Sequence, residues 1–399
     1  MAILQDTNYY NSNVPDYLAK SFAFNLIRYA PGGMCPLFGL TSLLPPKKAA
    51  AVEHGYFAKT MVFPSVTINH VAGYISADTT FTVTSSANLV VGEMLRVQST
   101  GEIVRLTAIN SATSITVARG VGQIAAASIA NSAKLYSVGN AFEQASNAPA
   151  SRLMNPARVM NMTQIFRNSW ALPKTVKVIQ AIVGDGNLAE SRNDCAMFHG
   201  ADIEKAMLFG QQSSGLVNGQ WMTTMDGIIE VVRRFAPAAN TTVAGGTTTF
   251  TQLETALNPC FDTITNGRNG NVRWLFCGGT AKTVINNIGR LSGVFQLQPD
   301  TTSFGLQFEM FKTSRGLFKI VEHPMLNSNS DWSKMAIAID IPSMAVPKLR
   351  ETENVEYGVR GDYVQDGRDA VGGTLTTELT TEFTNPSANA VIYGLTAAA

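Results

Sequence analysis

Few residues of this 399-residue chain combine the types and the spacing that catalysis or metal binding requires. His199 and Asp202 are the best candidates, because a spacing of three residues on a helix puts both side chains on one face, near Glu190 and Asp194. A metal site or an acid–base pair would need further side chains converging on them, and the chain has only 4 histidines, which are scattered. We therefore interpret His199 and Asp202 as part of a solvated or intersubunit polar face.

A second candidate is the glycine turn Gly120-Val-Gly122-Gln-Ile-Ala125, which fits the G-x-G-x-x-A pattern of a dinucleotide-binding turn. Glu143 follows at about the 20-residue distance at which such sites carry an acidic residue. A dinucleotide turn must open a helix inside a βαβ unit, whereas this one lies among short expected strands. We interpret it as a plain turn and predict no cofactor.

Motifs for nucleophilic chemistry and for tightly bound metals are missing from the sequence. It contains no G-x-S-x-G, no H-E-x-x-H and no G-x-x-x-x-G-K-[ST] motif. The 4 cysteines are widely spaced and form no C-x-x-C pair, so they predict neither a zinc cage nor a disulfide framework, which fits a reducing cytoplasm. We predict that the protein is not an enzyme.

The basic residues are too few for strong nucleic-acid binding. Lys+Arg 30 against Asp+Glu 29 gives a formal net charge of +1, so the chain carries no overall positive field. Two short clusters, Arg233-Arg234 and the stretch that holds Arg268 and Arg273, could touch phosphate. A solvated loop or an intersubunit salt bridge fits such short clusters better. We predict that Arg233, Arg234, Arg268 and Arg273 lie at contacts between subunits.

The composition is that of a folded chain with an uncharged surface. Hydrophobic residues make up 45%, enough for proper cores, while charged residues make up 15%, below the usual level of about 25%. Part of this uncharged surface is expected to become interface. The N-terminal residues lack a basic region followed by an apolar core, and no 18 apolar residues run uninterrupted. The sequence therefore predicts neither export nor membrane spanning.

The elements that must position these residues centre on one long helix. A strand-like run at 161–170 precedes a helical segment at 188–211, in surroundings that otherwise read as strand, turn or loop. Close-set, β-branched runs between 70 and 138 predict a small β-domain. Its expected strands are 79–84, 93–97, 102–109, 114–118 and 134–138. The flanks, 53–68 and 142–177, look extended, as though the β-domain replaced the tip of one long hairpin.

The remaining segments complete a mixed chain. Residues 1–50 are broken by Pro31-Gly32-Gly33 and by Pro45-Pro46, which predicts an extended arm whose apolar pieces lie on other domains or subunits. A locally packed N-terminal subdomain is the alternative. Residues 223–333 read as a compact α/β unit and the residues after 334 as strand-rich. The expected helices are 228–235, 249–265 and 279–289; the expected strands are 273–277, 304–312, 316–321, 335–341, 373–383 and 390–393.

This order of parts resembles the major capsid protein of tailed double-stranded DNA phages, whose fold is named after phage Hong Kong 97. It is most similar to a subfamily with a small β-domain in the extended loop. The resemblance covers nearly the whole chain. It is carried by residues 100–109, 117–122, 162–167 (M-T-Q-I-F-R) and 373–396.

The resemblance implies an α+β fold of five parts. They are an N-terminal arm (1–50), an extended β-hairpin loop (51–69 and 139–180), an inserted all-β domain (70–138), a peripheral domain with a spine helix (181–222 and 334–399) and an axial α/β domain (223–333). Lys59 is the only lysine in the first arm of this loop, residues 51–69, and is an expected intersubunit contact. No asparagine partner for covalent crosslinking can be assigned.

The implied function is a subunit that assembles into hexamers and pentamers of an icosahedral shell. The shell would enclose phage double-stranded DNA with weak, non-specific contacts. A separate scaffolding protein and a portal are expected partners, a decoration protein could bind the β-domain, and no membrane is involved. The protein would be assembled in the host bacterial cytoplasm and reside in the virion. Two alternatives remain: a cofactor-binding α/β enzyme built on 223–333, or another virion part such as a tail tube or connector.

Overall fold

The computed structural model describes residues 35–41, 44–61, 63–149, 154–178, 187–263, 270–292, 298–303, 306–357 and 369–396. The chain divides into two compact units. The larger comprises Met1–Tyr56 and Val159–Ala399, and the smaller comprises Phe57–Arg158.

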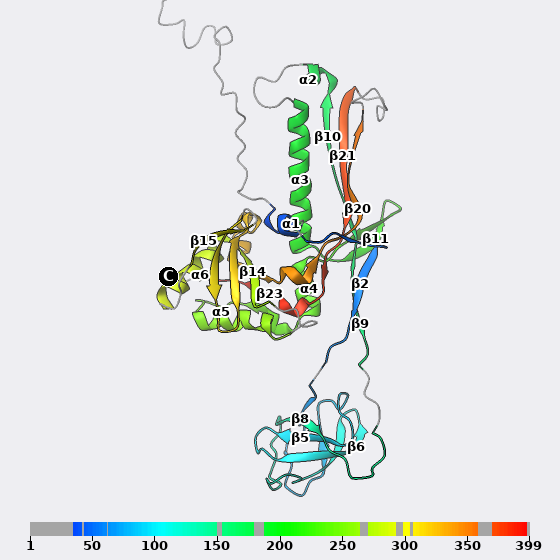
Figure 1. Ribbon diagram of the computed structural model, residues 1–399, viewed down its shortest axis with the longest axis vertical. Coiled ribbons are helices and arrows are strands. Elements are labelled where there is room, and N and C mark those ends of the chain that lie inside the picture. The colour runs from blue at the N-terminus through cyan, green and yellow to red at the C-terminus, as the bar shows by residue number, and fades with distance from the viewer. Residues whose placement is uncertain are drawn as a thin grey trace, which may run out of the picture. The chain divides into compact units, whose positions relative to one another are not determined.

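A seven-stranded mixed sheet forms the centre of one part of the larger unit (Figure 1). Its order is β13 (Thr241–Val243), β23 (Ala390–Tyr393), β18 (Ala336–Ile339), β14 (Val272–Cys277), β17 (Leu317–Glu322), β16 (Leu306–Lys312) and β15 (Gln298–Ser303). The β13–β23 and β14–β17 pairs are parallel and the other pairs are antiparallel. Successive side chains of a strand point to opposite faces, so Trp274 and Phe276 enter one hydrophobic core while Leu275 and Cys277 enter another.

Helices cover both faces of this sheet. On the Leu275 face lie α5 (Phe250–Leu257) and α6 (Gly279–Ser292), which contribute Leu253 and Ile285 to the core. On the other face lies α4 (Ile228–Phe235). A capping box between Thr249 and Gln252 starts α5. The helix expected over 249–265 is wrong in length: α5 ends at Leu257, and a 3-10 turn that contains a proline near its start follows.

The long helix α3 (Asn187–Phe209) packs against a four-stranded sheet (Figure 1). The sheet order is β1 (Lys47–Lys48), β20 (Pro347–Tyr357), β21 (Ala370–Leu379) and β10 (Gln164–Pro173). β10 and β21 pair antiparallel over their full length, from Gln164↔Leu379 to Pro173↔Ala370. Trp170 of β10, Cys195 of α3 and Val371 of β21 form a small core between them. The expected long helix and the expected strand before it are confirmed.

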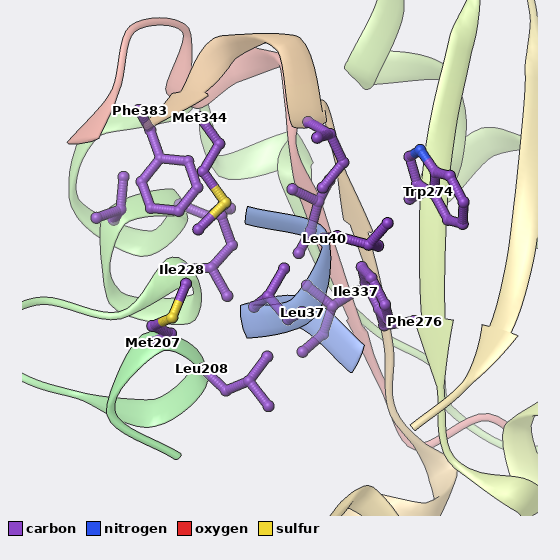
Figure 2. Packing of buried hydrophobic residues seen from close by; sticks show 14 of the residues in the cluster. Leu37, Leu40, Met207, Leu208, Ile228, Trp274, Phe276, Ile337, Met344 and Phe383 are labelled. Atoms are coloured by element: carbon purple, nitrogen blue, oxygen red, sulfur yellow. The ribbon is translucent and has the colours of Figure 1, made fainter. Parts of the chain in front are cut away.

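A short N-terminal helix, α1 (Pro36–Thr41), is part of the main core of the larger unit. Figure 2 shows Leu37 and Leu40 among Met207, Ile228 and Ile337. This part of residues 1–50 is therefore helical and packed on the same chain. The expected extended arm does not include it, whereas residues 1–34 lie outside the described residues.

The smaller unit holds a six-stranded sheet around its own core. Its order is β3 (Ser65–Thr67), β8 (Lys134–Asn140), β5 (Glu93–Val97), β6 (Ile103–Ser111), β7 (Ser114–Ala118) and β4 (Thr80–Thr82). Phe81, Leu95, Leu106, Ile115 and Leu135 are fully buried in it. All five strands expected here are present. β3 was assigned to the extended loop from sequence, yet it pairs with β8.

Shorter elements complete the described fold. They are β2 (Glu53–Ala58) paired with β9 (Ala157–Met162), the hairpin of β11 (Ser213–Val217) and β12 (Gln220–Thr224), β19 (Met344–Ala345) paired with β22 (Glu382–Phe383), and α2 (Lys174–Val178). The 3-10 helices are Ala238–Asn240, Asn258–Phe261, Pro324–Ser328, Trp332–Lys334, Ile341–Ser343 and Pro386–Ala388.

The mixture of helices and sheets confirms the predicted α+β class. One expected boundary does not follow the structure. The sequence assigns β18 and β23 to the peripheral domain, but both pair in the sheet of β14. Their apolar runs show that they are buried strands without showing which sheet they join.

Candidate functional site

Arg273 is not at a subunit contact, so that part of the sequence prediction is wrong. Its side chain is 0% exposed within its own chain and pairs with Asp340, with 3.1 Å between Nη1 and Oδ1. The guanidinium also donates to backbone carbonyl oxygens at 2.6 to 3.3 Å, those of Cys260, Gly270, Val272 and Ala388. Burial raises the pKa of Asp340, while Arg273 opposes that rise. Arg273 therefore ties β14 to the C-terminal segment and serves the fold.

Arg233 and Arg234 form ion pairs inside the chain but keep part of their surface free. Arg233 pairs with Glu230 one turn earlier, and its hydrogen bond holds the pKa of Glu230 below the ordinary value. Arg234 pairs with the buried Asp226 and donates to Gln212 Oε1 at 3.0 Å. The Arg233 side chain is 66% exposed. Its place at a subunit contact, and that of Arg234, stay predictions.

The other two predicted contact residues, Lys59 and Arg268, belong to other segments of the sequence. Lys59 is exposed and follows β2, in the smaller unit. Arg268 lies outside the described residues. Within the larger unit, the structure therefore places Arg233 and Arg234 side by side on α4, while Arg273 is buried on β14.

The glycine turn is a loop, as predicted, and opens no helix. The turn follows β7 and is held by Glu102. The carboxylate of Glu102 pairs with Arg119 at 2.8 Å and accepts the Gly120 N–H at 3.1 Å. Both charged side chains of this pair are buried. Glu143, the acidic residue of the supposed motif, instead pairs with Arg105. The turn therefore lacks the helix N-terminus on which a dinucleotide-binding turn places the pyrophosphate.

His199 does not lie on a solvated face. Its Nδ1 is 2.7 Å from Asn168 Oδ1 on β10, and its Nε2 is 2.8 Å from Thr377 Oγ1 on β21. Burial lowers the pKa of His199, and Asp202 opposes this shift. Asp202 is half-exposed and accepts hydrogen bonds from Asn168 and Lys205. The imidazole thus joins the long helix to the sheet, which corrects the interpretation from sequence for His199 and supports it for Asp202.

The Glu204 joint, made of Glu204, His323 and the backbone of Leu37 and Phe38, connects three distant segments. The wholly buried carboxylate accepts the N–H groups of Leu37 at 2.8 Å and Phe38 at 2.6 Å, at the start of α1. It also accepts from His323 Nε2 at 2.8 Å, while the Met325 N–H donates to His323 Nδ1. A carboxylate is favourable at the positive end of a helix. The joint therefore fixes α1 to α3 and to the end of β17.

A second buried joint connects β9, the link between β21 and β22, and the segment just before α4. Asn161 donates through Nδ2 to the carbonyl oxygens of Asp226 at 3.1 Å and Thr381 at 3.0 Å, and its Oδ1 accepts the Asp226 N–H at 2.8 Å. Asp226 Oδ1 in turn accepts the Gln212 N–H. Buried amides with every partner satisfied specify one arrangement of the backbone.

A third joint fixes the beginning of β2. Glu382 is nearly buried and accepts from Lys47 Nζ and from His54 Nε2 at 2.6 Å. Burial acts to raise the pKa of Glu382, but the hydrogen bonds from Lys47 and His54 outweigh it and hold that pKa below the ordinary value. Tyr56 donates to the Phe383 carbonyl oxygen beside it.

None of these polar clusters has the form of a catalytic or metal site. Among the described residues no group of three His, Cys, Asp or Glu side chains could hold a metal ion. The 4 cysteines are free, and burial raises the pKa of Cys260 and of Cys277 to about 12, which keeps both as unreactive thiols. Along the described part of the chain, no helix is both long and apolar enough to cross a membrane.

One surface element was missed in the sequence. Residues 213–215 look like a helix end, but they begin β11, and Asn218-Gly219 forms the turn to β12. Asn-Gly between apolar residues is a strong hairpin signal and could have located it.

Comparison with known proteins identifies relatives. A family model described as "SU10 major capsid protein" matches residues 7–396. A protein of Pseudomonas phage PaMx41, described as a major capsid protein, is 36% identical over 389 residues, covering 94% of this chain and 92% of that protein. These matches confirm the resemblance to phage major capsid proteins.

Solved structures also align with the chain along most of its length. A structure from Mycobacterium phage Bobi covers 95% of this chain and 96% of its own, at 8% identity and a TM-score of 0.49. The capsid of a native GTA particle covers 99% and 100%, at 7% identity and a TM-score of 0.48.

Proposed function

Because the chain belongs to the SU10 major capsid protein family and is therefore the structural subunit of a phage capsid, we propose that its copies form hexamers and pentamers that close an icosahedral shell around double-stranded DNA. The chain acts by its geometry, since each copy must contact its neighbours through surfaces that repeat until the shell closes. Neither the cofactor-binding enzyme nor the tail component gains support from the family match.

The segment from Phe57, near the end of β2, to Phe63 carries this proposal. Phe57, Met61 and Phe63 are 71%, 71% and 83% exposed. They occupy odd-numbered positions together with Lys59, as side chains along one face of an extended chain do. Exposed apolar side chains in such a row mark an interaction site. In a capsid of identical copies, a neighbouring subunit is the partner available to cover them.

We propose that the parts of the chain have the following structural roles in the capsid. Residues 51–69 and 139–180 form a loop that reaches a neighbour, and residues 70–138 form the β-domain inserted in it. The peripheral domain contains α3, β10 and β21. The axial domain takes residues 223–333 together with β18 and β23, which pair into its sheet. Arg233, Arg234, Arg268 and Lys59 lie at subunit contacts.

The partners beyond other copies follow from charge and from the exposed parts. A net charge of +1 leaves little attraction for DNA, which carries one charge per roughly 1.7 Å of axis, so the lining holds the genome weakly. A separate scaffolding protein and a portal direct assembly in the host cytoplasm, and the β-domain is the surface for a decoration protein.

Electron microscopy of the expressed protein tests the proposal. We expect closed shells, with the scaffolding protein co-expressed if the chain alone does not assemble. A variant with Phe57, Met61 and Phe63 replaced by serine should remain folded but form no shells. Val71→Ser, which removes an apolar residue of the β-domain that is 93% exposed, is the control and should assemble. Tubes or open rings would support a tail component, and a monomer that turns over a small molecule would support an enzyme.

A further inference from the structure

The β11–β12 hairpin is the most exposed apolar element of the larger unit that no described element covers. Its strands pair antiparallel from Ser213↔Thr224 to Val217↔Gln220. Asn218 and Gly219 have φ values of 51° and 76° at the turn. Two positive φ values characterise a type I′ turn, whose twist matches that of the strands it joins. The hairpin is therefore a well-formed element and projects from its unit (Figure 1).

The side chains of the hairpin are apolar where a solvated hairpin would be polar. Leu216 and Trp221 are direct partners across the strands, so they share one face, and they are 62% and 72% exposed. Val217 and Met222 are also exposed, and the pairing places them on the opposite face. No residue from 213 to 224 is charged. Water therefore contacts apolar surface on both sides of the hairpin.

The base of the hairpin is held firmly, so the tip is presented in a fixed direction. Thr223 Oγ1 donates to the Thr163 carbonyl oxygen at 2.6 Å, and the Met225 N–H donates to Gln164 Oε1 at 3.2 Å. Thr224 Oγ1 donates to the Gln211 carbonyl oxygen at 2.6 Å. A two-stranded hairpin is marginally stable in water on its own, so exposed strands of this kind gain from packing against a further surface.

We propose that this hairpin is an anchor between copies, in which Trp221 and Leu216 of one subunit pack against an uncharged surface of a second copy of the chain. This inference rests on the proposed function. Tryptophan is enriched among the residues that dominate binding energy at interfaces. Four apolar side chains offer only a few hundred Å², against about 800 Å² for each partner in a stable complex. The contact is thus too small for a dimer in solution and forms when many such contacts act together in the shell.

The first test compares assembly of Trp221→Ala with that of Trp332→Ala. Trp332 stacks on Phe209 of the same chain, with ring centroids 4.4 Å apart, so its loss should lower the melting temperature of the subunit and leave shell contacts intact. We expect Trp221→Ala to keep the melting temperature and to raise the subunit concentration needed for assembly by about tenfold or more. Unchanged assembly of Trp221→Ala, under conditions in which the natural chain forms shells, would overturn the inference but not the proposed function.

The second test does not depend on how a substitution affects folding. A photoreactive benzoylphenylalanine placed at Leu216 should crosslink one copy of the chain to another in assembled shells and give no dimer from free subunits. Crosslinks that stay within one chain, or that join only a different protein, would contradict the proposal. If the natural chain forms no shell under any condition, the proposed function itself fails.

Discussion

The Glu204 joint and the β11–β12 hairpin reverse the usual placement of polar and apolar residues. In the joint, a carboxylate and an imidazole are wholly buried. In the hairpin, a tryptophan and a leucine are mostly exposed. The buried pair is shielded from water and therefore depends on its partners within the chain, whereas the exposed pair leaves most of its apolar surface in contact with water. We therefore expect the stability of the subunit to depend on the Glu204 joint, and the association of subunits to depend on the β11–β12 hairpin.

The largest expected effect is a loss of subunit stability when Glu204 is replaced. Replacing Glu204 by alanine leaves His323 and two N–H groups of α1 buried without their acceptor. Leaving a buried donor without an acceptor typically costs about 1–3 kcal/mol of unfolding free energy, and three donors are affected here. Chemical denaturation of the subunit should show this loss, and Glu204→Gln, which keeps one acceptor oxygen, should show a smaller one. A stable Glu204→Ala subunit with a specific assembly defect would contradict the view that Glu204 serves the stability of the subunit and not its association.

A smaller effect is expected in the hairpin turn. Gly219 has a φ of 76°, a conformation that costs a residue with a Cβ about 1–2 kcal/mol. Gly219→Ala should therefore weaken the hairpin and shell assembly while leaving the main melting transition of the subunit unchanged. Gly245→Ala is the matched control, because that glycine also has open space around its Cβ position but does not have a positive φ. A lowered melting temperature without an assembly defect would show that the hairpin serves the subunit.

The sequence predicted the regular elements better than the residues that join them. The long helix and the buried strand at 273–277 follow from periodicity, which is local. Arg273 was misread because its carbonyl partners include that of Ala388, which lies 115 positions away. His199 was misread for the same reason, since Asn168 and Thr377 come from two other elements. The β11–β12 hairpin is different: Asn218-Gly219 marked it locally, and only the apparent helix end concealed it.

The pH dependence of stability should reveal His199, with a still smaller effect. Its folded pKa lies below the ordinary value of 6.5 because the ring is buried, so the unfolded chain binds the proton more readily. The stability that His199 contributes is therefore complete above about pH 6.5 and falls as the pH drops through 6.5 toward the folded value. Melting temperatures between pH 8 and pH 5.5 should fall less steeply in His199→Gln than in the natural chain. Parallel curves would refute this role.

The smallest effect is expected at an exposed ion pair, and it sets the scale for the others. Lys348 and Glu351 on β20 lie 2.8 Å apart with both side chains exposed, so solvent already satisfies each charge. Glu351→Ala should change the unfolding free energy by no more than about 1 kcal/mol. Since Glu204 and Glu351 are the same residue type, the difference between their alanine variants measures what burial and three hydrogen bonds add to a carboxylate. Equal losses would mean that the Glu204 joint does not hold α1 in place.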